Sequence, residues 1–126
     1  MPKTIHDAPN GPRPIGPYSI VTEANGFVFL SGMVPLDPAT GSGVEGDISA
    51  QTHRVMRNIG GVLGDVGLGF DDLVKTTIFL TDIADFPAVN AVYGEYVGEA
   101  RPARSTVQAA ALPGGFSVEI ECIAAR

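Results

Sequence analysis

The sequence contains a β-hairpin signal in its first quarter, at the dipeptide Asn25-Gly26. Asn-Gly is the pair that a two-residue type I′ turn favours, because both of its central positions need a positive φ. Residues rich in β-branched and aromatic side chains flank the turn, from Tyr18 to Ala24 and from Phe27 to Gly32. The sequence therefore predicts two antiparallel strands here, and the rest of the chain must fold around the sheet that they begin.

Two helices are predicted after this hairpin. The loop from Met33 to Gly46 is rich in proline and glycine and leads to Asp47, a residue suited to cap a helix. Apolar and small residues then recur at four- and three-residue steps as far as Gly67, which favours a helix end. These residues are Ile48, Thr52, Val55, Ile59, Val62 and Val66. A second helix is predicted to begin at Asp85-Phe86-Pro87.

Three further β-strands complete the predicted order. They cover Leu73 to Leu80, Ser105 to Ala111 and Ser117 to Ala125. Residues 1–17 hold five prolines and are expected to be extended, without regular structure. The order ββαβαββ predicts the α/β (α+β) class, as a two-layer fold in which a mixed sheet carries two helices on one face.

One predicted strand is apolar on both sides. Residues Phe27 to Leu30 read Phe-Val-Phe-Leu, although two helices can cover only one face of the sheet. The second face therefore requires another surface, and we expect a homo-oligomer formed through the sheet. A loop or the N-terminal arm folding over this face is the alternative.

Length and charge limit the class of protein. A chain of 126 residues is sufficient for one core, so residues 1–126 are expected to form a single domain. No apolar run approaches the length of about 20 residues that a membrane span needs. Eight Lys and Arg against fourteen Asp and Glu give a net charge of −6, which makes nucleic acid a poor candidate for a ligand.

Familiar motifs of catalysis and cofactor binding are missing. His6, His53 and Cys122 have no metal-ligand spacing, so no metal site is predicted. The segment from Gly41 to Gly46 matches GxGxxG, but it follows a turn and not a strand, and we interpret it as a loop. The single cysteine and the absence of a secretory signal at the start predict a protein of the reducing cytoplasm.

Arg104 and Glu119 are the remaining candidates for chemistry. Each begins one of the last two strands, and by alternation both are expected to point toward the uncovered face of the sheet. An arginine is suited to bind a carboxylate through two parallel hydrogen bonds, and a carboxylate in a cleft can move protons or hold water. The residues alone leave two interpretations open, a ligand site or a salt bridge that joins protomers.

Six short segments, read together, resemble the RidA family, also called YjgF or L-PSP, over nearly the whole chain. They are Ile15-Gly16-Pro17-Tyr18, Ser31-Gly32-x-Val34-Pro35, Val74-Lys75-Thr76-Thr77, Val89-Asn90-x-x-Tyr93, Pro102-Ala103-Arg104-Ser105 and Val118-Glu119-Ile120-Glu121. The resemblance implies a trimer of chorismate-mutase-like (YjgF-like) subunits with clefts between neighbouring subunits. It also implies hydrolysis of reactive 2-imino acids to 2-keto acids and ammonia, without a cofactor.

The resemblance further implies roles for particular residues. Arg104 would bind the substrate carboxylate, Glu119 would position or activate water, and Tyr18 would close the cleft. Substrate contacts would come from backbone groups at Gly32 and around Thr106, while Ser31 and Asn90 would shape the pocket. The expected ligands are small 2-imino and 2-keto carboxylic acids.

The sequence departs from the family at three positions that matter for the pocket. Thr106 replaces a common cysteine, Met33 a frequent glutamine, and Arg101 a common aromatic residue before Pro102. A second cation at Arg101 favours a dicarboxylate. Two other functions stay open, a non-catalytic metabolite-binding or chaperone-like trimer and the endoribonuclease or translation-inhibitor activity attached to some members. The net charge of −6 fits ribonuclease action poorly.

Overall fold

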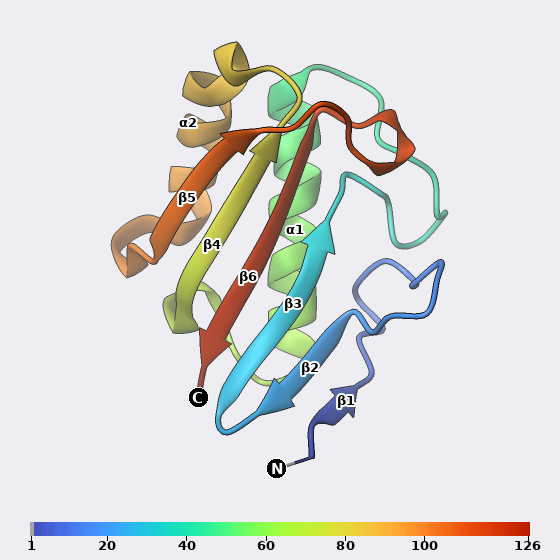
Figure 1. The fold of residues 1–126 in the computed structure, drawn as a ribbon, viewed down its shortest axis with the longest axis vertical. Coiled ribbons are helices and arrows are strands. Elements are labelled where there is room, and N and C mark those ends of the chain that lie inside the picture. Colours follow the sequence, from blue (N-terminus) through green and yellow to red (C-terminus); the bar gives the residue numbers. More distant parts are fainter. Residues whose placement is uncertain (1) are drawn as a thin grey trace.

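The strands form one mixed sheet in a computed structural model that describes residues 2–126 (Figure 1). Their bounds are β1 (Thr4–His6), β2 (Val21–Ala24), β3 (Phe27–Met33), β4 (Leu73–Leu80), β5 (Ala103–Gln108) and β6 (Val118–Ala125). The strand order is β1-β2-β3-β6-β4-β5. All neighbours are antiparallel except β4 and β5, which are parallel. The predicted class, an α+β fold with a mixed sheet, is confirmed.

Both predicted α-helices are present, as α1 (Ile48–Asp65) and α2 (Phe86–Val97). Short 3-10 turns occur at η1 (Phe70–Asp72), η2 (Ile83–Asp85), η3 (Gly98–Ala100) and η4 (Pro113–Gly115). Asp47 caps α1, because its side chain accepts a hydrogen bond of 2.9 Å from the backbone N–H of Ala50. The buried face of α1 also includes Met56 and Leu63, which the predicted stripe lacks, because a core-facing stripe is wider than one row of side chains.

The hairpin at Asn25-Gly26 is confirmed. Asn25 and Gly26 have φ of 54° and 81°, as the predicted turn requires, and Ala24 pairs with Phe27 across it. The first strand begins at Val21 and not at Tyr18. Just before this strand, the carbonyls of Ser19 and Ile20 accept hydrogen bonds from the side chain and backbone of Ser31.

The N-terminal arm contains a strand that the sequence did not predict. Residues Thr4–His6 form β1, which pairs with β2, so the expectation of an arm without regular structure was wrong for this part. These residues lie between Pro2 and Pro9 and include no proline, so their backbone N–H groups are available to the sheet. Met1, also within that expectation, lies outside the described residues.

Strand β5 is shorter than predicted at its end and begins earlier. It runs from Ala103 to Gln108 because β4, its only strand partner within residues 2–126, ends at Leu80, which lies opposite Gln108. The last strand agrees with the prediction to within one residue. Its side chains Val118, Ile120, Cys122 and Ala124 are buried, as the alternation predicted.

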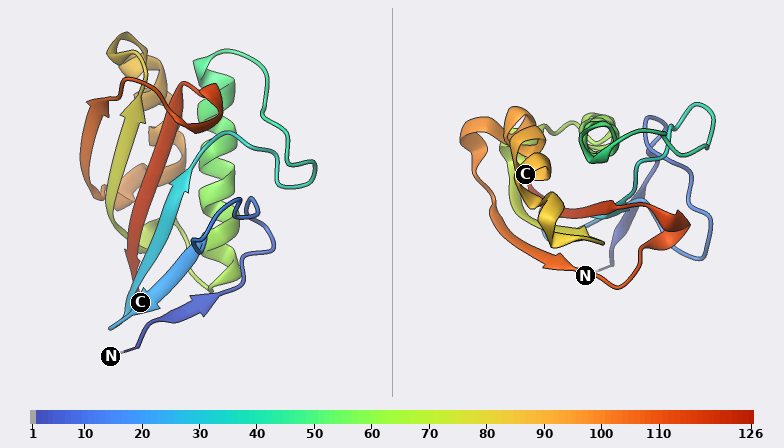
Figure 2. Two further views of the ribbon diagram at one scale, coloured as in Figure 1. Left: turned by 45° about the vertical axis from the view of Figure 1, so that its right-hand side comes forward. Right: turned by 90° about the horizontal axis from the view of Figure 1, so that it is seen from above.

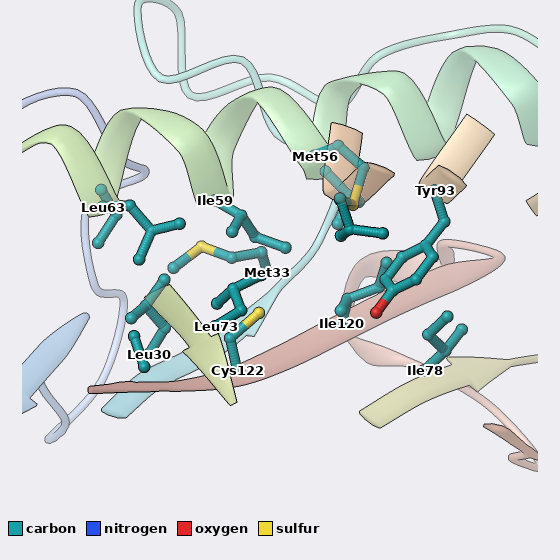
Figure 3. Close-up of a cluster of buried hydrophobic side chains, with 14 of the residues drawn as sticks. Leu30, Met33, Met56, Ile59, Leu63, Leu73, Ile78, Tyr93, Ile120 and Cys122 are labelled. Atoms are coloured by element: carbon teal, nitrogen blue, oxygen red, sulfur yellow. The ribbon is translucent and has the colours of Figure 1, made fainter. Parts of the chain in front are cut away.

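Both helices cover the same face of the sheet, as the view from above in Figure 2 shows. The core lies between these layers, where Met56 and Tyr93 from the helices meet Ile78 and Ile120 from the strands (Figure 3). The opposite face is uncovered and partly apolar. On β3, Phe27 and Phe29 are 47% and 42% exposed, while Val28 and Leu30 between them are buried.

Within residues 2–126, neither α-helix combines the length and the apolar character that crossing a membrane requires.

Candidate active site

Glu119 lies on the face of the sheet that the helices leave uncovered. Its neighbours on β6, Val118 and Ile120, are buried beneath the helices, and side chains alternate between faces along a strand. Burial raises the pKa of the Glu119 carboxyl above its usual value, and the charge of Glu121 raises it further. Within residues 2–126, no hydrogen bond or ion pair engages this carboxylate. Its oxygens are therefore available to water or to a ligand.

A β-bulge in β3 lies beside this carboxylate. Leu30 pairs with Cys122 and Met33 with Ile120, so two residues of β3, Ser31 and Gly32, span the position of one residue on β6. A Cβ atom at Gly32 would overlap the carboxylate of Glu119. Any side chain at residue 32 would force the Glu119 carboxylate to move, so glycine allows the acid to lie directly over the backbone of the bulge.

Ser31 attaches the N-terminal arm to the bulge. Its hydroxyl donates a hydrogen bond of 2.6 Å to the carbonyl of Ser19, and its backbone N–H donates one of 2.8 Å to the carbonyl of Ile20. Tyr18, which precedes these residues, is 48% exposed. It lines a cavity of about 340 Å³ together with Ser31, Gly32 and Glu119. We call these four residues the acidic half-site.

Arg104 does not point toward the uncovered face, so that expectation was wrong. On β5 it lies beside Thr76 of the parallel strand β4, and the Thr76 side chain is buried under α2. Neighbouring residues in register share a face, and Arg104 accordingly contacts α2. The alternation could not be determined from sequence because β5 is an edge strand whose residues are exposed or half-buried on both sides.

Three side chains of α2 hold the guanidinium of Arg104. Its Nη1 donates a hydrogen bond of 2.8 Å to Oδ1 of Asn90. Its Cζ lies 5.1 Å from the ring centre of Tyr93 and 5.2 Å from that of Phe86, within the range of cation–π attraction. Phe86, Asn90 and Tyr93 lie on successive turns of the helix, so they form one surface against the cation.

Tyr93 is itself held in place by a contact with strand β4. Its hydroxyl lies 2.8 Å from that of Thr76, and both side chains are buried. Burial raises the pKa of the Tyr93 phenol, although the hydrogen bond to Thr76 and the charge of Arg104 act in the opposite direction. A cavity of about 390 Å³ opens beside this group and is also lined by Arg101 and Pro102. We call Phe86, Asn90, Tyr93 and Arg104 the cationic half-site.

The two half-sites are apart on one chain. Glu119 and Val107 both lie opposite Phe79 of β4, and Arg104 is three residues before Val107 on β5. Two strand spacings sideways and three residues along the strand separate the two Cα atoms by roughly 14 Å. Because the side chains also point to opposite faces, one small molecule cannot contact both on the same chain.

Thr106 lies outside both cavities. It is next to Ile78 in the β4–β5 register, and its hydroxyl oxygen is buried without a hydrogen-bond partner within residues 2–126. The predicted contact of substrate with the backbone around Thr106 stays a prediction.

Some residues that support the site had no role assigned to them from the sequence. Phe86 and Tyr93 stood at helical spacing with Asn90, and an aromatic residue on each side of an amide was the available signal. Asn58 is a buried polar side chain of α1 that donates to the carbonyls of Val34 and Leu36, two residues of the loop that lines the acidic half-site. Thr76 stood within the segment Val74-Lys75-Thr76-Thr77 of the family resemblance, but no local pattern gave its hydroxyl a role.

Other candidate groups lie outside the site. Cys122 is buried in the core, and burial together with the charge of Glu121 raises its pKa to about 12, so its thiol is unreactive at neutral pH. His53 contacts the hydroxyl of Tyr96 at 2.8 Å between the two helices. Residues 2–126 contain no group of three or more His, Cys, Asp or Glu placed to hold a metal ion.

These features define a class, a small α+β protein with an uncovered sheet face and two complementary half-sites. The family model described as Endoribonuclease L-PSP matches residues 8–126. The chain is 52% identical to Protein DfrA of Myxococcus xanthus over 124 residues, which cover 97% of this chain and 94% of that protein. It is 41% identical to the 2-iminobutanoate/2-iminopropanoate deaminase of Mus musculus over 115 residues, covering 91% and 85%.

A solved structure agrees with this assignment. The crystal structure of a protein of unknown function of the conserved Rid protein family from Yersinia pestis superposes with a TM-score of 0.96 at 45% identity. The match covers 99% of this chain and 100% of that one. The chain belongs to the RidA/YjgF/L-PSP family.

Proposed function

We propose that the protein is a 2-iminobutanoate/2-iminopropanoate deaminase, an enzyme that hydrolyses reactive enamines and imines to 2-keto acids and ammonia. The mouse relative carries that name at 41% identity. The observation that carries the proposal is the pair of half-sites, an oriented arginine without a carboxylate partner and a partly buried acid without a hydrogen-bond partner within residues 2–126. The arginine is suited to bind a small anion, and the acid is suited to activate the water that reacts with it.

Each residue has a defined task in this reaction. Arg104 binds the substrate carboxylate, and Asn90 with the two rings keeps its guanidinium in place. Glu119 holds a water molecule beside Gly32 and accepts one of its protons as the oxygen attacks. Its raised pKa suits this step, because a general base works best when its pKa is nearer to the working pH.

The reaction balances without an oxidant, a reductant or a cofactor. Water adds across the C=N bond, so that a C–O bond forms at C2 and the nitrogen gains a proton. The C–N bond of this adduct then breaks, the nitrogen leaves with the bonding electrons as ammonia, and the oxygen loses its proton to form the 2-keto acid. Glu119 can carry both protons. It passes the proton taken from water to the nitrogen as the adduct forms, and it then transfers the proton of the C2 hydroxyl to the nitrogen as the C–N bond breaks.

We propose further that the active form is a cytoplasmic homotrimer in which Arg104 of one copy faces Glu119 of the next. The separation of the half-sites on one chain and the exposed Phe27 and Phe29 support this assembly. Tyr18 would close the cleft. Ser31, Gly32 and the backbone around Thr106 would complete it, and residues 1–126 would act as one domain.

Turnover of imines tests the proposal directly. The purified protein is mixed with 2-iminopropanoate or 2-iminobutanoate formed in place, and keto-acid release is compared with the spontaneous rate, with semicarbazide as a competing trap. Light scattering on the same sample should give three times 13.1 kDa. Release at the spontaneous rate would contradict a deaminase and would favour a metabolite-binding or chaperone-like trimer, because Arg104 serves binding as well as catalysis. A mass of one chain would remove the cleft between copies.

A further inference from the structure

The cavity beside the cationic half-site contains a second arginine. Arg101 and Arg104 are both exposed, and both line the space of about 390 Å³ that Asn90, Tyr93 and Pro102 help to enclose. No acidic side chain lines this cavity, and within residues 2–126 neither arginine is in an ion pair. Two of the eight Lys and Arg residues of a chain with net charge −6 therefore meet at one cavity.

The backbone does not explain why an arginine stands at this position. Arg101 has φ 46° and ψ 59°, a left-handed conformation that non-glycine residues rarely adopt. It also precedes Pro102, which disfavours helical conformations in the residue before it. Gly98, three residues earlier in the same connection, has φ 49° and is the residue type that such a backbone favours. The backbone conformation at residue 101 thus disfavours an arginine. We therefore look to its side chain for a function.

We propose that this cavity binds a second carboxylate, so that the preferred substrates are 2-imino dicarboxylates with four or five carbons. The inference rests on the proposed function and refines its substrate class. The carboxylate next to the imine binds Arg104, and the distal carboxylate binds Arg101. Water adds at C2 and ammonia leaves as for a monocarboxylate, while the distal carboxylate takes no part in the bond changes.

Binding of stable dicarboxylates tests this inference without any turnover. Isothermal titration with succinate and 2-oxoglutarate is compared with propanoate and 2-oxobutanoate for the natural protein, Arg101→Ala and Arg57→Ala. Arg57 is an exposed residue of α1 that lines none of the described cavities and loses the same charge, which makes it the matched control.

The natural protein and the control should bind the dicarboxylates ~10–150-fold more tightly than the monocarboxylates, the range that one added charge-assisted interaction supports. Arg101→Ala should lose this preference and keep its affinity for the monocarboxylates. Equal affinities in the natural protein, or a preference that survives in Arg101→Ala, would overturn the inference.

A second variant separates lost binding from lost structure. Arg101→Gly removes the cation and places at residue 101 a residue that adopts the left-handed conformation without strain. Its unfolding midpoint should therefore equal or exceed that of the natural protein, while its preference for dicarboxylates disappears. A preference that persists in this folded variant would again reject a role for Arg101.

Turnover distinguishes failure of the inference from failure of the function. With 2-iminosuccinate and 2-iminopropanoate as substrates, kcat/KM should favour the dicarboxylate by a similar factor, and Arg101→Ala should abolish the difference. Hydrolysis of both imines at equal kcat/KM overturns the inference and leaves the proposed function standing. If neither imine is hydrolysed, the proposed function fails, and the titration alone decides whether the cavity binds dicarboxylates.

Discussion

Arg104 and Glu119 differ in how the rest of the chain holds them. The guanidinium of Arg104 has a hydrogen bond to Asn90 and lies against two aromatic rings, so one chain fixes its position. Glu119 has no such partner within residues 2–126, and its cavity is lined by the half-exposed Tyr18 of the N-terminal arm. One half-site is preorganised within a protomer, and the other depends on ligand, water or a second copy to complete it.

The largest expected effect comes from separating the two half-sites onto different chains. Arg104→Ala and Glu119→Gln should each lower turnover by ~10²-fold or more, the usual contribution of a binding fork or an acid–base group. Mixing the two variants in equal amounts and exchanging their subunits should then restore about a quarter of the natural activity, because one interface in four joins an intact Arg104 to an intact Glu119. Turnover is measured before and after exchange.

The mixture has a matched control in each variant exchanged with itself, which should stay inactive. Activity that does not return in the mixed sample, once mass spectrometry shows that mixed trimers have formed, would contradict a site shared between Arg104 of one copy and Glu119 of the next.

Arg104→Lys is a smaller change in the cationic half-site than Arg104→Ala. Lysine keeps the charge but cannot form two parallel hydrogen bonds, so kcat/KM should fall ~10–150-fold while the assembly stays intact. Kinetics and light scattering on the same samples check this. If activity recovers at high protein concentration, the arginine acts by holding subunits together and not by binding substrate.

Tyr93→Phe separates the two contributions of Tyr93, the ring that contacts Arg104 and the hydroxyl that contacts Thr76. Loss of the hydroxyl leaves that of Thr76 buried without its partner and should destabilise the protein by about 1–2 kcal/mol. The ring remains under the guanidinium, so kcat/KM should stay within ~3-fold of its natural value. Urea unfolding and kinetics measure both quantities.

Tyr96→Phe is the comparison variant, because its hydroxyl contacts His53 at a less buried position. A larger stability loss in Tyr96→Phe than in Tyr93→Phe would contradict the structural role given to Thr76.

The smallest effect concerns the charge of Glu119. Burial raises the pKa of this carboxyl in the folded state, so its ionisation opposes folding once the pH exceeds the usual value of 4.5. Glu119→Gln should therefore raise the unfolding midpoint at pH 7 to 8, and the gain should vanish as the pH falls below about 4.5. Thermal unfolding across this range is compared with the exposed control Glu95→Gln. A gain that persists in acid would assign the effect to packing instead.

The sequence was sufficient to predict the elements that have a clear local signal or one buried face. The hairpin turn, both α-helices and the burial of alternate residues in β6 all have local signals, in turn chemistry, capping and periodicity. The side on which Arg104 lies had no such signal, because an edge strand exposed on both sides has no alternation to read. The bulge at Ser31-Gly32 depends on which strands become neighbours, and the contact between Thr76 and Tyr93 depends on how α2 packs on β4. Local patterns in a single sequence do not contain that information.

The family resemblance added what local patterns could not supply. It predicted that Arg104, Glu119 and Tyr18 belong to one site, whereas periodicity placed only helices and strands. The comparisons established the family and left the roles of these residues to experiment. Arg104 shows the limit of the local argument, because strand alternation predicted the wrong face of the sheet for its side chain.

One further consequence follows from Glu23 on β2. Its carboxylate lies 2.8 Å from Nε2 of His6 on β1 and accepts hydrogen bonds of 2.9 and 3.1 Å from the guanidinium of Arg126, the final residue. These contacts, led by that of Arg126, lower the pKa of Glu23, so the carboxylate keeps its charge as the pH falls. Glu23 thus ties β1 to the residue that follows β6. Residues fused after Arg126 would start beside β1 and the arm that carries Tyr18, so kinetic work on the cleft should compare protein with and without such a fusion.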